Sequence, residues 1–296
     1  MRVLNFGSIN IDHVYRLPHF VRPGETLSSE SYSRFGGGKG LNQSIALAHA
    51  GAPVVHAGKI GAGDEWLRER LQRSGADVTF VETVDGPSGH AIIQVNRDGE
   101  NAIILHGGAN RRVTSGDGAR ILEAFGVGDY LLLQNEISAI PDIMLQAAQR
   151  GLRIVFNPAP MHADVLAYPL DCVSCFVLNE IEAAGLTGDP DPAESLRALR
   201  LRYPHAAVVL TLGDKGALFA DECARLQVPA LRVKAVDTTA AGDTFIGYFL
   251  AETMRGVAAE EALRTACRAA ALCVVRPGAA DSIPRRDEVA AFEPAG

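Results

Sequence analysis

Apolar strand patterns alternate with helical patterns along most of this chain. The strand patterns are short, whereas the helical patterns repeat their apolar residues every three or four positions. Strands that are separated by helices pair in parallel, and helices then cover both faces of the sheet. We therefore predict an α/β fold with a central, mostly parallel sheet, in which the strands are residues 3–6, 54–60, 130–134, 154–157, 175–179 and 207–211 and the helices are residues 41–50, 65–73, 141–150, 192–202, 243–254 and 258–275. Gly151 and Gly185 stand where helix C-terminal caps are expected.

Two further stretches are extended and have no helix of their own. Residues 90–96 and 101–106 are short β patterns, and the Asp98-Gly99 pair between them favours a hairpin. Residues 14–35 are extended and rich in turn residues. We expect a small β-sheet that projects as a lid, made of residues 11–36 and 86–108. The α/β catalytic core then comprises residues 1–10, 37–85 and 109–296.

Charge and composition limit the classes of partner. The net charge of −7 and the absence of a long basic run argue against a nucleic-acid-binding protein. We see no signal peptide and no apolar stretch long enough to cross a membrane, so no membrane partner is expected. The five cysteines are an odd number and favour a reduced, cytoplasmic setting. Cys172 and Cys175 have no second Cys or His pair at ligand spacing and are interpreted as structural.

The segment from Asp237 to Phe245 reads Asp-Thr-Thr-Ala-Ala-Gly-Asp-Thr-Phe and opens a helical pattern. Small residues allow close approach of an anion, and the first turn of a helix leaves N–H groups unpaired. Such a turn can hold a phosphate. An acidic side chain beside a phosphate is electrostatically unfavourable unless it has a catalytic role. The role that fits Asp243 is to take a proton from an attacking hydroxyl group.

Polar residues also follow several predicted strands. Asn10 and Asp12 come after the first strand, Glu136 after residues 130–134, Asn179 after residues 175–178 and Thr211 to Gly216 after residues 207–210. The carboxyl edge of a parallel sheet is where ligands bind. Each residue alone is compatible with a turn, a helix cap or an exposed loop, but their meeting at one edge predicts a binding site.

A glycine-rich loop precedes the predicted helix at residues 41–50. Residues 36–43 read Gly-Gly-Gly-Lys-Gly-Leu-Asn-Gln. The glycines allow the backbone to lie against a ligand, and Lys39 and Asn42 can reach hydroxyl or phosphate groups. A flexible turn with a solvated lysine is the alternative interpretation. A Walker A sequence and a complete Gly-x-Gly-x-x-Gly pattern are both absent from the chain.

From about residue 4 to about residue 290 the chain resembles the ribokinase branch of the PfkB carbohydrate kinase family. Residues 237–245 resemble the second signature of this family, which is highly specific. The other matching segments are Gly7–Asp12 and Gly37–Gln43 (the first signature), Gly99–Asn101 and His106–Asn110 (in the lid), and Asn179–Glu182 (an Asn-x-x-Glu element). The resemblance implies the ribokinase-like fold, with a sheet flanked by helices and a small β-sheet lid.

The resemblance also implies a role for each matched residue. Asp243 is expected to be the general base, and the N–H groups of Ala241, Gly242 and Asp243 are expected to form an anion hole. The residues expected to hold the sugar are Asn10, Asp12, Gly38, Lys39, Asn42, Glu136 and Asp243. Those expected at the nucleotide are Asn179, Thr211, Gly213, Gly216 and Gly242, with Glu182 organising Mg²⁺ through water.

A monovalent cation, usually potassium, is a further implication of the resemblance. Its expected ligands are the Asp237 carboxylate and the carbonyl groups of Thr239, Cys273, Arg276 and Gly278. The implied activity is ATP-dependent phosphorylation of a small sugar, with D-ribose as the first candidate. Another sugar or nucleoside (2-deoxyribose, fructose or adenosine) and a sugar sensor without catalysis remain open. A homodimer through the lid is expected, because an uncovered sheet face needs a partner.

Overall fold

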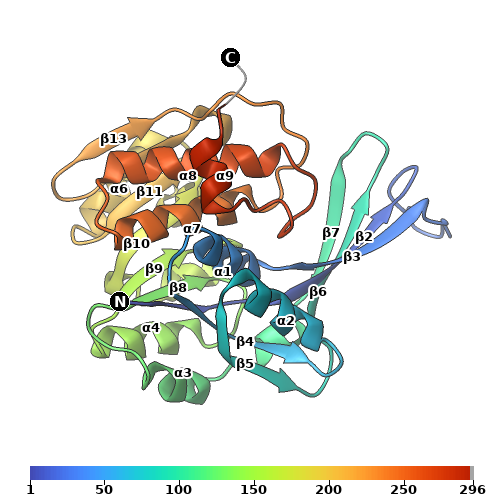
Figure 1. Ribbon diagram of the computed structural model, residues 1–296, viewed down its shortest axis with the longest axis horizontal. Helices are drawn as coiled ribbons and strands as arrows, with labels where there is room; N and C mark the ends of the chain where they lie inside the picture. The colour runs from blue at the N-terminus through green and yellow to red at the C-terminus, as the bar shows by residue number, and fades with distance from the viewer. Residues whose placement is uncertain (294–296) are drawn as a thin grey trace.

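The computed structural model describes residues 1–293, so the last three residues of the predicted core segment lie outside it. A nine-stranded sheet forms the centre of the molecule (Figure 1). Its strands are β1 (Val3–Phe6), β4 (Val54–Gly61), β5 (Asp77–Val84), β8 (Tyr130–Gln134), β9 (Arg153–Asn157), β10 (Val173–Asn179), β11 (Ala207–Thr211), β12 (Ala217–Ala220) and β13 (Arg225–Val228). The order across the sheet is β13-β12-β11-β10-β9-β8-β1-β4-β5.

All neighbouring strands of this sheet pair in parallel except at one edge, where β12 pairs antiparallel with β11 and with β13. The predicted α/β class with a mostly parallel sheet is therefore confirmed. β1 lies inside the sheet, with Val3 opposite Val54 of β4 on one side and Tyr130 of β8 on the other. The carboxyl ends of β1, β8, β9, β10 and β11 consequently meet at one edge.

Helices cover both faces of the sheet (Figure 1). One face carries α1 (Lys39–His49), α2 (Glu65–Ser74), α7 (Ala241–Met254) and α8 (Ala259–Val274), and the other carries α3 (Ser115–Leu122), α4 (Ile140–Gln149), α5 (Glu180–Thr187) and α6 (Pro192–Arg202). α9 (Arg286–Ala291) packs against α8. Successive strand residues point to opposite faces. Val3 therefore belongs to the apolar core under α1 and α7, whereas Leu4 belongs to the core under α4.

Most helix boundaries differ from the sequence prediction by one or two residues, and the helices α3, α5 and α9 were not predicted. α7 begins at Ala241, two residues earlier than predicted, because Ala240 takes a left-handed conformation (φ 62°) and forms the N-cap. Gly185 was predicted as a C-terminal cap, and this prediction is wrong. Gly185 lies inside α5, and the left-handed residue that ends this helix is Gly188 (φ 80°). Gly151, with φ 75°, directly follows the C-cap of α4, as predicted.

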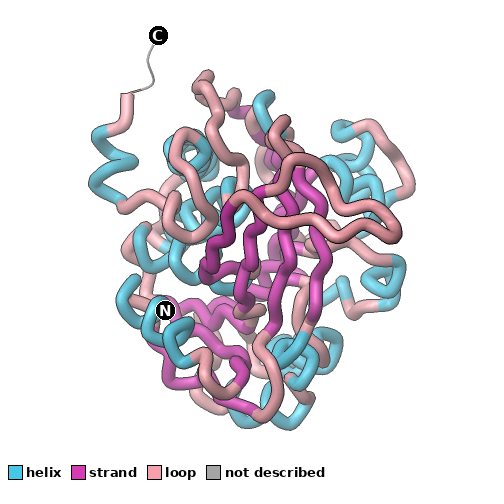
Figure 2. Tube along the Cα trace, turned by 90° about the vertical axis from the view of Figure 1, so that its right-hand side faces the viewer, coloured by secondary structure: helices cyan, strands magenta, loops and turns pink. Residues whose placement is uncertain are grey.

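A second, four-stranded sheet projects from the core, and we call it the lid sheet. Its strands are β2 (Asn10–Arg16), β3 (Ser31–Gly37), β6 (Gly89–Val95) and β7 (Asn101–His106), in the order β3-β2-β6-β7. β2 pairs in parallel with β6, and the other two pairings are antiparallel. Figure 2 shows the lid strands side by side, with the helices behind and beside them. The predicted hairpin through Asp98-Gly99 joins β6 to β7.

Both sheets meet at the site region. β1 leads directly into β2, and β3 leads into α1, so the lid sheet is tied to the core where the glycine-rich loop begins. Among residues 1–293, no helix is both long enough and apolar enough to cross a membrane. All five cysteines are free thiols.

Candidate active site

The start of α7 lies over the carboxyl edge of the sheet, beside a cavity. The turn that precedes it is closed by the Asp237 carboxylate, whose Oδ1 accepts a hydrogen bond from the Thr239 N–H at 2.9 Å. The Ala241 N–H donates to the Thr238 carbonyl at 3.3 Å. Gly242 and Asp243 belong to the first helical turn, where N–H groups have no intrahelical acceptor. The helix therefore presents donors and the positive end of its dipole to the cavity.

Asp243 is buried and held by two amides from α1. Its Oδ2 accepts from Nδ2 of Asn42 at 3.0 Å, and its Oδ1 accepts from Nε2 of Gln43 at 2.9 Å. α1 can approach α7 this closely because Gly247 has no side chain. A Cβ at Gly247 would lie 2.4 Å from Cβ of Ala46. Both carboxylate oxygens are thus oriented by neutral donors.

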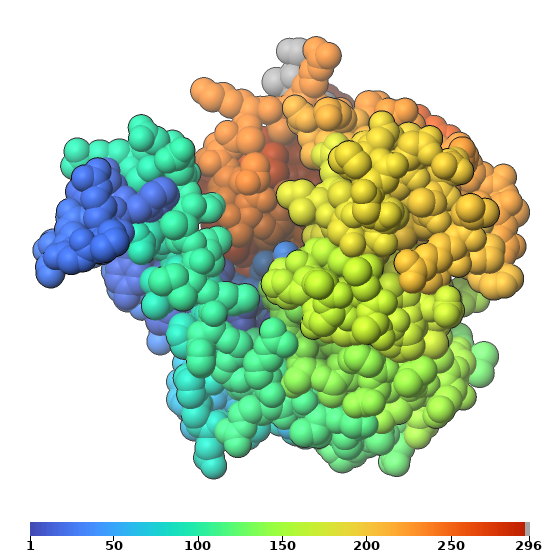
Figure 3. Space-filling model, turned by 180° about the vertical axis from the view of Figure 1, so that it is seen from behind, coloured from blue at the N-terminus to red at the C-terminus, as the bar shows by residue number. Residues whose placement is uncertain are grey.

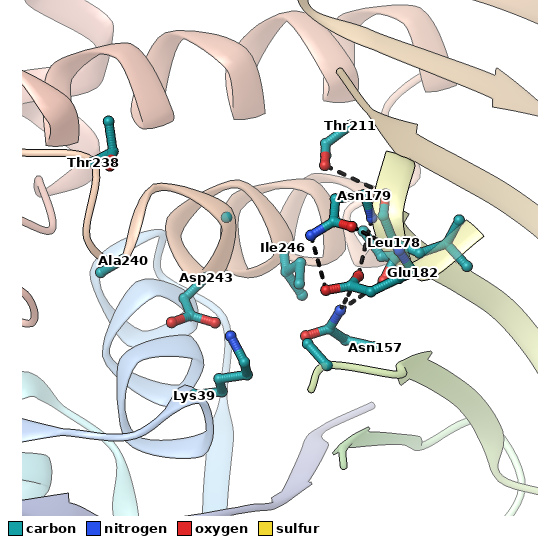
Figure 4. Close-up of a pocket in the computed structure, with 13 residues that line it drawn as sticks. Lys39, Asn157, Leu178, Asn179, Glu182, Thr211, Thr238, Ala240, Asp243 and Ile246 are labelled. Atoms are coloured by element: carbon teal, nitrogen blue, oxygen red, sulfur yellow. Dashed lines mark hydrogen bonds between the residues drawn. The ribbon is translucent and has the colours of Figure 1, made fainter. Parts of the chain in front are cut away.

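A cavity of about 250 Å³ lies between Asp243 and the ends of β9, β10 and β11. It is lined by Lys39, Asn157, Ala159, Val177, Leu178, Asn179, Glu182, Thr211, Thr238, Ala240, Gly242, Asp243 and Ile246. In Figure 4 the side chains of Lys39 and Asp243 point toward one another on one side, and Asn157, Asn179 and Glu182 form a group on the other. Figure 3 shows a hollow between the lid and the core.

Asn179 and Glu182 begin α5 with a reciprocal cap. Oδ1 of Asn179 accepts from the Glu182 N–H at 2.9 Å, and Oε2 of Glu182 accepts from the Asn179 N–H at 3.0 Å. This capping box fixes both side chains at the end of β10. Burial raises the pKa of Glu182 above its ordinary value. A cation in the cavity would therefore stabilise this carboxylate in its charged form.

A second cavity, of about 90 Å³, lies on the lid side of the sheet edge. It is lined by Asn10, Leu105, His106, Gly107, Asn110, Arg111, Asn135, Glu136, Pro160 and His162. Oε2 of Glu136 accepts hydrogen bonds from the Ser8 hydroxyl and, at 3.0 Å, from the Lys39 N–H. Burial raises the pKa of Glu136. Oδ1 of Asn10 accepts from Nδ2 of Asn110 at 2.7 Å, which fixes the amide of Asn10 at the cavity wall.

Asp12 lies on β2 and packs against the glycine-rich loop. A Cβ at Gly37 would stand 2.0 Å from Oδ2 of Asp12, so a side chain at this position would require the Asp12 carboxylate to move. Burial, and then the negative charges of Glu136 and Asp243, raise the pKa of Asp12 from 3.8 to about 6. Gly38 follows with φ 89°, a conformation that favours glycine, and forms the N-cap of α1.

Lys39 supplies positive charge between the two cavities. Burial lowers the pKa of Lys39, as expected for an ammonium group taken out of water. The nearby carboxylates of Asp243, Glu136 and Glu182 outweigh this effect, so the pKa lies above its ordinary value. Lys39 therefore remains protonated and offsets part of the acidic charge of the site.

The predicted nucleotide residues lie partly at the cavity. Thr211 lines it at the end of β11, and its hydroxyl donates to the Leu178 carbonyl at 3.3 Å. Gly213 and Gly216 lie in the turn that follows, outside the cavity lining described above. At Gly216 (φ 102°) a Cβ would lie 2.0 Å from the Val228 carbonyl oxygen, so this glycine is required by the β12–β13 hairpin packing.

The residues predicted around a monovalent cation come from the turn before α7 and from the end of α8 with the loop that follows it. Oδ2 of Asp237 accepts from the Gly278 N–H at 3.1 Å, although 41 positions separate them. Sγ of Cys273 lies 3.7 Å from the Thr239 carbonyl oxygen. The Cys273 carbonyl accepts from the Arg276 N–H at 3.1 Å. The turn before α7 and the segment at the end of α8 are thus in contact through Asp237, Thr239, Cys273 and Gly278.

Several buried polar residues near the site have no role predicted from the sequence, among them Ser8, Gln43, Asn110, Asn135 and Asn157. Gln43 adjoins Asn42 within the glycine-rich motif, but the motif alone does not indicate its function. Asn157 ends β9, so the rule that drew attention to Asn179 and Thr211 also applied to it. Ser8 and Asn110 act through hydrogen bonds to Glu136 and Asn10, which the sequence does not reveal.

The fold and the site together define a phosphotransferase that acts on an alcohol group of a small molecule. Comparison with known proteins makes the assignment specific. Residues 2–286 match the model of the pfkB family carbohydrate kinases, and the chain belongs to this family.

Individual relatives agree with this assignment. A protein of Haemophilus influenzae named ribokinase is 35% identical, with 97% of this chain and 96% of the relative covered. The crystal structure of ribokinase from Cryptococcus neoformans var. grubii in complex with ADP is 36% identical with a TM-score of 0.86, and 98% of each chain is covered. Arabidopsis thaliana ribokinase complexed with ribose and ATP is 29% identical with a TM-score of 0.85, and 99% of each chain is covered.

Proposed function

We propose that this chain is an ATP-dependent ribokinase, which converts D-ribose and ATP to ribose 5-phosphate and ADP. The observation that carries the proposal is the position of Asp243. This carboxylate lies at the N-terminus of α7, lines the larger cavity and raises the pKa of Asp12 through its charge, so it stands between the two groups of binding residues. The ribokinases with bound ribose, ATP or ADP described above support the choice of substrates.

The reaction requires a base, an anion site and correct positioning. Asp243 takes the proton of the O5 hydroxyl as this oxygen attacks the γ-phosphorus of ATP. The bond between the γ-phosphorus and the oxygen that bridges it to ADP breaks, and ADP leaves with that electron pair. The N–H groups at Gly242 and Asp243 and the Lys39 ammonium stabilise the negative charge on the transferred group. The Ala241 N–H closes the turn that orients these donors.

The buried amides and acids fit the hydroxyl groups of a small sugar. Oδ1 of Asn42 is a buried acceptor with no hydrogen-bond partner in the described part of the chain, and it suits a hydroxyl donor. Asn10, Asp12 and Glu136 add an amide and two carboxylates on the lid side. Each can bind a hydroxyl, and the narrow volume on this side favours a sugar over a bulky nucleoside.

The charges at the cavity also fit the metal ions that such a reaction uses. Glu182 and Asn179 would hold Mg²⁺ largely through water, and this ion would neutralise charge on the phosphate groups. Among residues 1–293 no group of three or more His, Cys, Asp or Glu side chains could hold a metal ion. Potassium would sit near Asp237 and the carbonyl groups of Thr239, Cys273, Arg276 and Gly278, where it would offset the carboxylate charge.

The lid sheet is proposed to cover the sugar and to form a homodimer with a second copy of the chain. β7 is an edge strand of this sheet, and Ile103, Ile104 and Leu105 on it are each more than half exposed. An exposed apolar edge strand requires cover. Light scattering should give twice the mass of one chain, and Ile104→Lys should shift it toward the monomer. A monomer at all concentrations would remove the dimer from the proposal.

The test of the activity is a coupled assay of ADP release over ribose, 2-deoxyribose, fructose and adenosine, with and without potassium. Ribose should give the highest kcat/KM. A higher kcat/KM with another compound would keep the chemistry and replace the substrate. Sugar binding by calorimetry with no ADP release from any compound would instead favour a sugar sensor on the same fold.

A further inference from the structure

Two buried amides connect Asp243 with Glu182. Nε2 of Gln43 donates to Oδ1 of Asp243 at 2.9 Å and to Oδ1 of Asn157 at 3.3 Å. Nδ2 of Asn157 donates in turn to Oε2 of Glu182 at 3.3 Å. Gln43 is fully buried on α1 and Asn157 is 5% exposed at the end of β9. A continuous path of side chains thus joins the proposed base to the acid on the opposite side of the cavity.

Backbone carbonyl groups determine the orientation of the amides at one end of this path. A carbonyl oxygen accepts only, so Nδ2 of Asn5 must face the Gly40 carbonyl, 2.8 Å away. Oδ1 of Asn5 therefore accepts from Nε2 of Gln134 at 2.9 Å. Nε2 of Gln134 also donates to Oε1 of Gln43 at 2.7 Å, so the Gln43 amide must direct its NH₂ group toward Asp243.

The other end of the path is determined in the same way. Nδ2 of Asn157 donates to the Val177 carbonyl at 3.0 Å, which again can only accept. Oδ1 of Asn157 is consequently directed toward Gln43. Both ends of the path require the same direction for each amide. Reversal of either amide would place donor beside donor or acceptor beside acceptor in a buried region, which is unfavourable.

We propose that Gln43 and Asn157 are positioning residues that hold the Asp243 carboxylate in its reactive orientation and couple it to Glu182. The proposal rests on the assignment of Asp243 as the base of the kinase reaction. Gln43 is neutral, so it orients the carboxylate while adding no positive charge that would compete with the proton. Asn157 contacts Glu182 on the phosphate side of the cavity, and only the Gln43 side chain lies between Asn157 and Asp243. A rearrangement on the phosphate side can therefore alter the orientation of the base.

The kinetic test compares Gln43→Met and Asn157→Leu with a control, Gln146→Met. Methionine and leucine keep roughly the size of the side chain and remove the amide. Gln146 is a partly buried glutamine on α4 that donates to Ser115, so the control loses an amide elsewhere. Gln43→Met should lower kcat about 10-fold to 100-fold, because misplaced groups cost about this much. The Kd for ribose without nucleotide should stay within about threefold, and the control should match the parent protein.

Epistasis separates positioning from a structural role. In an Asp243→Asn background the base is already lost, so Gln43→Met should lower the residual kcat by less than about twofold. An equal loss in both backgrounds, or no loss of kcat in Gln43→Met, would overturn the proposal. Thermal melts accompany each variant. If Gln43→Met does not fold, Asn157→Leu and Asn157→Asp carry the same comparison, and Asn157→Asp should retain more activity because it keeps the acceptor for Gln43.

Two measurements that do not require catalysis test this proposal independently of the proposed function. Calorimetric titration of ADP at increasing Mg²⁺ should show a weaker dependence on Mg²⁺ in Asn157→Leu than in Gln146→Met. A crystal structure of Gln43→Met should show Asp243 rotated or in more than one conformer. The coupling would be contradicted, even in an active kinase, if Asn157→Leu left ADP binding unchanged and Gln43→Met left the orientation of Asp243 unchanged. If both the Mg²⁺ dependence of ADP binding and the orientation of Asp243 changed in a protein that phosphorylates no sugar, the coupling would be supported and the proposed activity would be contradicted.

Discussion

Nδ2 of Asn42 donates to Oδ2 of Asp243 across 3.0 Å, although 201 positions separate the two residues in the chain. The contact joins the glycine-rich loop and α1 to the start of α7, that is, the sugar-binding side to the phosphate side. Asn42 uses one amide hydrogen on the proposed base and keeps its buried Oδ1 as an acceptor. The same side chain can therefore align the base and bind a substrate hydroxyl.

The first prediction concerns Asp243→Asn. The substitution removes the base and keeps nearly the same size, so kcat should fall by about 10²-fold to 10⁴-fold while sugar binding persists. Turnover is measured by ADP release and binding by calorimetry. Asp142→Asn, a change of the same kind in the first turn of α4, serves as the control. Near-normal turnover in Asp243→Asn would mean that another group is the base.

The second prediction concerns the stability of Asp12→Asn. The pKa of Asp12 rises from 3.8 to about 6 on folding, because of burial and then the charges of Glu136 and Asp243. The native state therefore binds this proton more tightly than the unfolded state, and the contribution of Asp12 to stability is present below pH 3.8 and is lost as pH rises to about 6. Asn carries no charge and avoids this loss.

Thermal melts without sugar check this sign. Asp12→Asn should be more stable than the parent protein at about pH 8, and the advantage should shrink as the pH is lowered through about 6 toward about 4. Sugar binding should weaken in the same variant, since a hydroxyl acceptor is lost. An advantage that stays constant with pH would show that the carboxyl group of Asp12 has an ordinary pKa.

The third prediction compares two glycines of α7. A Cβ at Gly247 would meet Cβ of Ala46 at 2.4 Å and the Leu47 nitrogen at 2.8 Å, whereas a Cβ at Gly242 meets no atom within 4 Å. Gly247→Ala should therefore destabilise the fold by about 1–3 kcal/mol. Gly242→Ala should leave stability unchanged and raise KM for ATP, because Gly242 lines the cavity. Denaturant unfolding and steady-state kinetics distinguish the two effects, and equal stability of both variants would contradict the close packing of α1 on α7.

Sequence reasoning was most successful where local pattern and burial act together. β11 and α6 were placed at their observed bounds, because an apolar run or an Asp-Pro start leaves little freedom. Gly185 was misplaced, since glycine also occurs inside helices where another chain packs closely. At Gly185 a Cβ would lie 2.6 Å from the side chain of Met161. That contact spans distant segments and is invisible in the local pattern.

The same reasoning identified the site residues that stand in motifs, but not the buried amides that connect them. Asp243 and Asn179 stand in recognisable motifs at element boundaries. The role of Gln43 depends on Gln134 and Asn157, which reach it from β8 and β9 across 91 and 114 positions. Pairings of this kind follow from strand order and side-chain direction in three dimensions. A sequence pattern indicates which residues are polar and buried, whereas their partners require the fold.

The last prediction concerns the proposed potassium site. Burial raises the pKa of Asp237, but hydrogen bonds from Thr239 and Gly278 outweigh it, so the pKa lies below its ordinary value and the carboxylate stays charged. In the parent protein, potassium should raise kcat on the order of tenfold, which corresponds to about 1.4 kcal/mol in the barrier. Asp237→Ala should abolish this response and lower the basal rate, because the turn before α7 loses both a ligand and a hydrogen-bond acceptor. Sodium and choline chloride at equal ionic strength control for screening. A full potassium response in Asp237→Ala would place the cation elsewhere or show that it acts only through ionic strength.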